Sequence, residues 1–135
     1  LRFGSEDFKG AFFLVRLLEG TGGYPAYTGP LHFDAHAYRT EDAEGVWDFA
    51  RGCMRTYKIL AAKAKAFDAD PEIAQILADN RKAGASHAKA VAMYSKTAAS
   101  RLRLEEFDAE TLAARGYRYE RLDQIAIEHL AGVRG

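Results

Sequence analysis

The chain has 135 residues, 48% of them hydrophobic and 12% aromatic, which is enough for one domain with a core. Nineteen basic residues balance nineteen acidic ones, so binding to nucleic acid or to an anionic membrane surface is not expected. The single cysteine excludes an internal disulfide framework and favours a reducing compartment, so we expect a cytoplasmic protein. The sequence shows neither an apolar run of membrane-spanning length nor a signal peptide.

A helix is expected from about residue 5 to 19, with Ser5 as its N-cap and Gly20 as its stop. Glycines and prolines then predict a long surface loop up to Pro30. Residues 31–34 are the best strand candidate in the chain. Because an isolated strand leaves its backbone groups without ladder partners, we expect those partners to lie outside this chain.

A second, long helix should begin near Thr40, because apolar residues between positions 46 and 67 keep one face for about seven turns. The pair Asp70 and Pro71 predicts the start of a short helix. Residues 80–100 should form helical or irregular pieces.

The end of the chain is expected to be helical as well. Asp108 should cap a short helix that ends at Gly116. The last helix should span about residues 117–131, with His129 on its apolar stripe and Gly132 as its C-cap.

The order of these elements indicates an α/β fold. A helix, a glycine-rich loop, a short strand and a long helix in succession are typical of a βα series from a larger parallel sheet. A complete TIM barrel needs about 250 residues and eight strands. This chain can therefore hold only part of one, and its first residue, Leu1, suggests a chain whose beginning is missing.

The most suggestive polar group is His32, Asp34 and His36, because residues two apart share one face of an extended strand. Two imidazoles and a carboxylate on one face form a plausible donor set for a divalent metal. Asp34 also lies at the end of the expected strand, where βα barrels place their active sites. In the alternative interpretation His32 packs inside, Asp34 caps a loop and His36 is solvated.

Other reactive or aromatic side chains have simpler explanations. Cys53 lies on the apolar face of the long helix, as expected for a buried, inert thiol rather than a nucleophile. Trp47 is expected to be a packing residue. His87 and His129 have no second metal ligand at useful spacing, so we expect them on the surface or on a helix face.

Several strings that occur in a fixed order are similar to those of one enzyme family. They are Leu1-Arg2-Phe3-Gly4, Ala11-Phe12-Phe13-Leu14-Val15, His32-Phe33-Asp34, Arg39-Thr40-Glu41-Asp42, Gly45-Val46-Trp47, Ala113-Ala114-Arg115-Gly116 and Glu120-Arg121-Leu122-Asp123-Gln124-Ile125-Ala126. Over essentially its whole length, the chain resembles the C-terminal portion of xylose isomerase, also called glucose isomerase.

This resemblance implies an α/β fold of the TIM (β/α)8 type, of which the chain contains only the last segments. Residues 1–68 would form the last βα units of the barrel. Residues 69–135 would form a helical C-terminal arm that wraps a neighbouring subunit of a homodimer or homotetramer.

The resemblance also implies an aldose-ketose isomerase that interconverts D-xylose and D-xylulose, and D-glucose and D-fructose, by a hydride shift. Two divalent metal ions, Mg²⁺, Mn²⁺ or Co²⁺, would be its cofactors. Asp34 would be a metal ligand, and no catalytic residue would lie in this chain. The family's Asp-x-Asp ligand pair would fall immediately before Leu1, so we expect activity only with the remainder of the barrel. A related metal-dependent sugar isomerase or epimerase, and a noncatalytic helical interaction module, are the alternatives.

Overall fold

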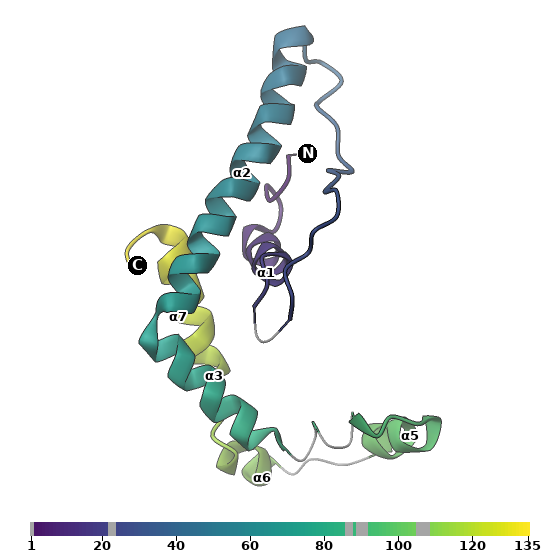
Figure 1. The fold of residues 1–135 in the computed structure, drawn as a ribbon, viewed down its shortest axis with the longest axis vertical. Helices are drawn as coiled ribbons and strands as arrows, with labels where there is room; N and C mark the ends of the chain where they lie inside the picture. Colours follow the sequence, from purple (N-terminus) through teal and green to yellow (C-terminus); the bar gives the residue numbers. More distant parts are fainter. Residues whose placement is uncertain (1, 22–23, 86–87, 89–91, 105–108) are drawn as a thin grey trace. The chain divides into compact units, whose positions relative to one another are not determined.

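The computed structural model describes residues 2–21, 24–85, 88, 92–104 and 109–135, and these residues form helices and connecting segments. The helices are α1 (Phe8–Leu18), α2 (Ala43–Ala69), α3 (Pro71–Ala83), α5 (Lys96–Leu104), α6 (Ala109–Ala114) and α7 (Tyr119–Ala131) (Figure 1). The chain divides into two compact units, Leu1–Asp70 with Gln124–Gly135, and Pro71–Asp123. We describe each unit by itself.

The first two helices begin one turn or less from the expected positions, at aspartate caps rather than at Ser5 and Thr40. The Asp7 carboxylate accepts a hydrogen bond from the Gly10 N–H at 2.7 Å, and the Asp42 carboxylate accepts one from the Gly45 N–H at 2.9 Å. Both bonds satisfy backbone donors that the first turn leaves free. The prediction of the two helices is confirmed. The predicted N-cap Ser5 is wrong, and the second helix begins after Asp42, close to the expected start near Thr40.

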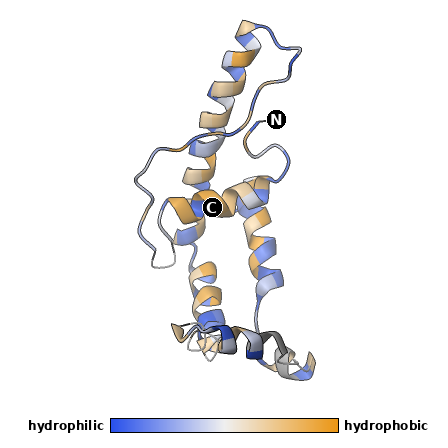
Figure 2. Cartoon of the chain, turned by 90° about the vertical axis from the view of Figure 1, so that its right-hand side faces the viewer, coloured by the Kyte–Doolittle hydropathy of each residue, from blue (hydrophilic) through white to orange (hydrophobic). Residues whose placement is uncertain are grey.

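The core of the first unit forms where α1 packs against α2. Its fully buried side chains come from one face of each helix: Phe12, Val15, Cys53, Leu60, Ala64 and Phe67, together with Ile125, Ala126 and His129 of α7. The predicted apolar face of α2 is therefore buried from Cys53 onward, while Val46 near its start is exposed. Figure 2 shows orange, hydrophobic bands recurring along this helix between blue ones.

The second unit has a smaller set of buried side chains. Ile73 and Ile76 of α3 are fully buried, and the Arg121 guanidinium donates to both carboxylate oxygens of Glu72 at 2.7 and 3.0 Å. The short helix expected after Pro71 and the last helix are confirmed. The Asp108 cap, His87 and the Gly22–Gly23 part of the first loop lie outside the described residues.

The predicted strand at residues 31–34 is wrong, since the described residues form no strand there. The stretch between α1 and α2 is drawn in Figure 1 as a coil without arrows. Next to the predicted strand, the Ala35 N–H donates to the Phe33 carbonyl at 2.9 Å and so closes a short turn. A strand exists only as a member of a ladder, and the described part of the chain offers this segment no second strand.

In the described part of the chain, no helix combines the length with the apolar character that a bilayer crossing requires.

Candidate functional site

Asp34 lies on the wall of a cavity of about 280 Å³ in the first unit. The cavity wall comes from the N-terminal turn, α1, the extended segment and α2: Arg2, Phe3, Leu14, Leu18, Leu31, His32, Phe33, Asp34, Ala35 and Tyr57. Apolar side chains form most of this wall, and among its described lining residues Asp34 supplies the one carboxylate. The carboxylate is exposed and therefore accessible to a ligand.

The segment that carries Asp34 is held through the residue before it. The Phe33 ring packs on the Phe3 ring, with 5.3 Å between centroids. The backbone N–H of Phe3 in turn donates to the Cys53 sulfur on α2 at 3.4 Å. These contacts fix the extended segment against α2 without any β-ladder, and they place Asp34 at the cavity.

Tyr57, which lines this cavity, makes a half-buried hydrogen bond that joins α2 to the end of α1. The Tyr57 hydroxyl donates to a Glu19 carboxylate oxygen at 2.8 Å. Burial, the hydrogen bond to Glu19 and the charge of Glu19 together raise the pKa of Tyr57 from 10.0 to about 12. Sequence reasoning placed Tyr57 on the apolar face of the helix and missed its polar partner, which lies 38 residues away.

We expect Tyr57→Phe to lower the free energy of unfolding of the chain by about 1–2 kcal/mol, because it leaves the Glu19 carboxylate without this donor. The raised pKa makes the contribution complete below pH 10, and it is lost as the pH rises through about 12. Urea unfolding of both proteins at the two ends of this range measures the effect. A stability difference that stays constant up to pH 12 would contradict the assignment.

The three-residue metal set His32, Asp34 and His36 is not formed. His32 shares the cavity with Asp34, but His36 lines a different one. Nowhere among the described residues do three or more histidine, cysteine, aspartate or glutamate side chains gather as a metal site. The hypothesis that this chain alone presents two imidazoles and a carboxylate to a metal is wrong, because the period-two alternation on which it rested requires a strand.

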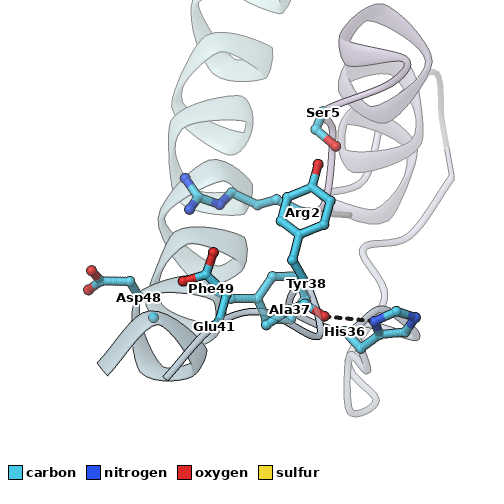
Figure 3. Close-up of a pocket in the computed structure, with 9 residues that line it drawn as sticks. Arg2, Ser5, His36, Ala37, Tyr38, Glu41, Asp48 and Phe49 are labelled. Atoms are coloured by element: carbon cyan, nitrogen blue, oxygen red, sulfur yellow. Dashed lines mark hydrogen bonds between the residues drawn. The ribbon is translucent and has the colours of Figure 1, made fainter. Parts of the chain in front are cut away.

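The second cavity, of about 390 Å³, lies between the residues before α2 and the start of that helix (Figure 3). Arg2, Ser5, His36, Tyr38, Glu41 and Asp48 are its polar lining residues. Figure 3 shows the Tyr38 hydroxyl pointing toward Ser5, while His36 turns aside, its Nδ1 2.8 Å from the Ala37 carbonyl oxygen. These side chains do not converge on one point as metal ligands would.

The remaining sequence candidates divide into confirmed and corrected ones. Cys53 is 1% exposed, which confirms the prediction of a buried thiol. Trp47 was expected to pack, but its side chain is 64% exposed. His129 is on a helix face as expected, and it is 1% exposed.

A cluster around Asp70 was missed entirely. The Asp70 carboxylate accepts hydrogen bonds from Arg134 Nε at 2.5 Å, from Arg134 Nη2 at 3.1 Å and from His129 Nε2 at 3.2 Å. The partners are 59 and 64 residues from Asp70, so no local pattern connects them. The available signal was a histidine on an otherwise apolar helix stripe, which indicates a buried polar partner.

Comparison with known proteins gives two close relatives, although no family model matches the chain. A xylose isomerase of Thermus caldophilus is 53% identical over 135 residues, and one of Thermus thermophilus is 54% identical over the same length. Both matches cover 100% of this chain and 34% of the relative. The chain thus spans about a third of the length of the curated relatives it matches.

Proposed function

Since the chain belongs to the xylose isomerase family, as the C-terminal portion of such a protein, we propose that the full-length protein interconverts an aldose and a ketose. D-xylose and D-xylulose are the proposed pair, with D-glucose and D-fructose as a second pair. The observation that carries the proposal is an overall identity of 53–54% in matches that cover the whole chain. The matched length therefore includes the Asp34 segment and both units.

The proposal includes the architecture of the full-length protein. Residues 1–68 contribute the last βα units of a TIM barrel, and the segment 31–34 becomes a strand when neighbouring strands supply its ladder. Residues 69–135 contribute a helical arm that associates with another copy in a homodimer or homotetramer. Among the side chains described in the second unit, only Ile73 and Ile76 are fully buried, which supports an arm that buries its apolar faces elsewhere.

Asp34 is the proposed metal ligand of this chain. Its carboxylate is exposed on a cavity wall, and hard divalent cations such as Mg²⁺, Mn²⁺ or Co²⁺ prefer carboxylate oxygens. Because such an ion takes about six oxygen ligands, the other ligands belong to the remaining two thirds of the full-length protein. When bound, the two ions would polarise the sugar oxygens carried by the two carbons between which the hydride moves.

The rest of this chain supports that carboxylate. Phe3 and Phe33 hold the backbone on which Asp34 sits. Leu14, Leu18 and Leu31 give one side of the cavity an apolar lining. A cytoplasmic location, in keeping with the free Cys53 thiol, is part of the same proposal.

The test compares Asp34→Asn with Asp79→Asn in the full-length protein. Loss of an outer-shell partner alone costs about 10- to 100-fold in metal affinity or activity, so loss of a ligand charge should cost at least ~10-fold at limiting Mg²⁺. Asp79 is an exposed residue of α3 that accepts a hydrogen bond from Gln75, which asparagine can also accept, so its variant should be unaffected. Xylulose formation and Mg²⁺ affinity are measured for both variants.

Each part of the proposal has its own contrary result. Normal activity of Asp34→Asn at limiting Mg²⁺ would remove Asp34 from the metal site and leave the enzyme assignment standing. Absence of isomerisation of xylose and glucose by the wild-type protein with Mg²⁺, Mn²⁺ or Co²⁺ would contradict the enzyme assignment itself.

A further inference from the structure

Three side chains, from the end of α2, from α7 and from the C-terminal tail, form what we call the Asp70 clamp: Asp70, His129 and Arg134. The side chain of Asp70 is 9% exposed and that of His129 is 1% exposed. The Arg134 guanidinium donates hydrogen bonds to both oxygens of the Asp70 carboxylate, through Nε and Nη2. A carboxylate can only accept hydrogen bonds, so His129 holds its Nε2 proton toward Asp70.

The tail that carries Arg134 is itself fixed in place. Gly132 adopts a left-handed conformation with φ of 77° after α7, and the Val133 N–H bonds to the Glu128 carbonyl at 3.1 Å. The Lys63 ammonium donates to the His129 carbonyl oxygen at 2.5 Å. The clamp is therefore tied to α2 at two places, at Lys63 and at Asp70.

The members of the clamp lie close, along the chain, to the two points where the chain passes from one unit to the other. The second unit begins at Pro71, the residue after Asp70, and the chain returns to the first unit at Gln124, shortly before His129. Every member of the clamp belongs to the first unit. The clamp thus joins the segment that leaves the first unit at Asp70 to the segment that re-enters it at Gln124. We call residues 71–123 the excursion, and this junction its root.

We propose that the Asp70 clamp fastens the root of this excursion, so that residues 71–123 can hold a second copy of the protein. The second clause rests on the proposed function, in which the arm mediates self-association. A charged, forked contact suits this task because it has a single geometry, and breaking it by removing one partner leaves buried charge behind. Hydrophobic packing alone would permit several arrangements of nearly equal free energy.

The experiment compares Asp70→Asn with Asp68→Asn in the full-length protein. Asp68 also pairs with an arginine, Arg16 at 2.6 Å, but this pair joins α2 to α1 and includes no residue of α7 or of the C-terminal tail. Hydrogen exchange followed by mass spectrometry reports on peptides from α1, α3 and α7. Sedimentation at a series of concentrations gives the dissociation constant of the assembly, and circular dichroism confirms that each variant is folded.

We expect Asp70→Asn to reduce exchange protection by about tenfold or more in α7 and at the start of α3, with α1 unchanged. Its dissociation constant should rise by about tenfold or more, while Asp68→Asn leaves both readouts near wild type. Arg134→Lys, which keeps the charge and loses the fork, should give the same pattern more weakly.

Other outcomes overturn the proposal in recognisable ways. Equal effects of the Asp68 and Asp70 variants, or unchanged protection in α7, would show that the clamp has no special role. Loosened protection with an unchanged dissociation constant would separate the clamp from self-association. A wild-type protein that is monomeric throughout would overturn the oligomeric arm, while isomerase activity would still stand as the separate test of the proposed reaction.

Discussion

Replacing Phe67 with alanine should lower the free energy of unfolding of the 135-residue chain by about 3–5 kcal/mol. Phe67 is 1% exposed and lies where the parts of the first unit meet. Its ring centroid is 5.4 Å from that of Phe12, 6.2 Å from that of Phe13 and 5.5 Å from that of His129. Truncation would remove the shared contact of α1, α2 and α7 at once and leave a cavity.

The charge of Arg16 adds to this expectation. Its guanidinium carbon lies 5.2 Å from the centre of the Phe67 ring, within the range of a cation–π interaction. The same guanidinium pairs with Asp68, so loss of the ring also loosens that ion pair. The effect of Phe67→Ala should therefore lie toward the upper end of the range.

Urea unfolding followed by far-ultraviolet circular dichroism measures the change, with Met54→Ala as the matched control. Met54 is a large apolar residue on the same helix, but it is 51% exposed. Its truncation should shift the unfolding midpoint by much less than that of Phe67. Equal shifts for the two variants would mean that the first unit has no core at Phe67.

The helices of this protein can be predicted from sequence because their causes are local. The apolar series on α2 repeats at the helical period, and it is buried from Cys53 to Phe67. The predicted cap Ser5 and the predicted start near Thr40 each lie two residues before the observed cap, because several acidic or hydroxyl side chains compete at each start. At both helices the aspartate immediately before the first turn is the cap, in place of Ser5 and Thr40.

The strand at residues 31–34 could not be decided from its own residues, because a strand is a property of a pair. The segment is extended and lacks a ladder here, and we propose that neighbouring strands of the full-length protein complete it. The predicted metal set of His32, Asp34 and His36 was wrong for the same reason, because these side chains share one face only if the segment is a β-strand. Asp34 remains a proposed ligand through the resemblance to xylose isomerases, which comparison with the Thermus proteins confirmed.

The polar contacts that close the fold were beyond sequence reasoning for a different reason. Tyr57 is hydrogen-bonded to Glu19, and Asp70 is hydrogen-bonded to His129 and Arg134, over separations of 38 to 64 residues along the chain. Periodicity identified the helix faces on which Tyr57 and His129 lie, but it carries no information about which acid they meet. Only the packing of α1 and α7 against α2 brings these groups together.

Replacing Gly20 with alanine is the second change with a large expected effect on the stability of the chain. Gly20 follows α1 with a φ of 85°, a conformation that costs about 1–2 kcal/mol for residues with a Cβ atom. A Cβ atom there would also meet the backbone nitrogen of Ala26 at 2.8 Å, so the loop would have to move. That loop is held to α1 by the bond from the Tyr27 N–H to the Leu18 carbonyl at 2.8 Å.

Gly116→Ala separates the two contributions, because Gly116 has a φ of 68° but, among the described residues, no atom lies within 4 Å of an added Cβ. The Gly116 variant should show the conformational cost alone, and the Gly20 variant should lose about 1–2 kcal/mol more, as strain or a broken loop contact. Urea unfolding of both variants gives the two values. Equal losses of stability in the two variants would indicate that the loop after Gly20 moves without cost. In that case the loop would not fix the segment before Asp34 against α1.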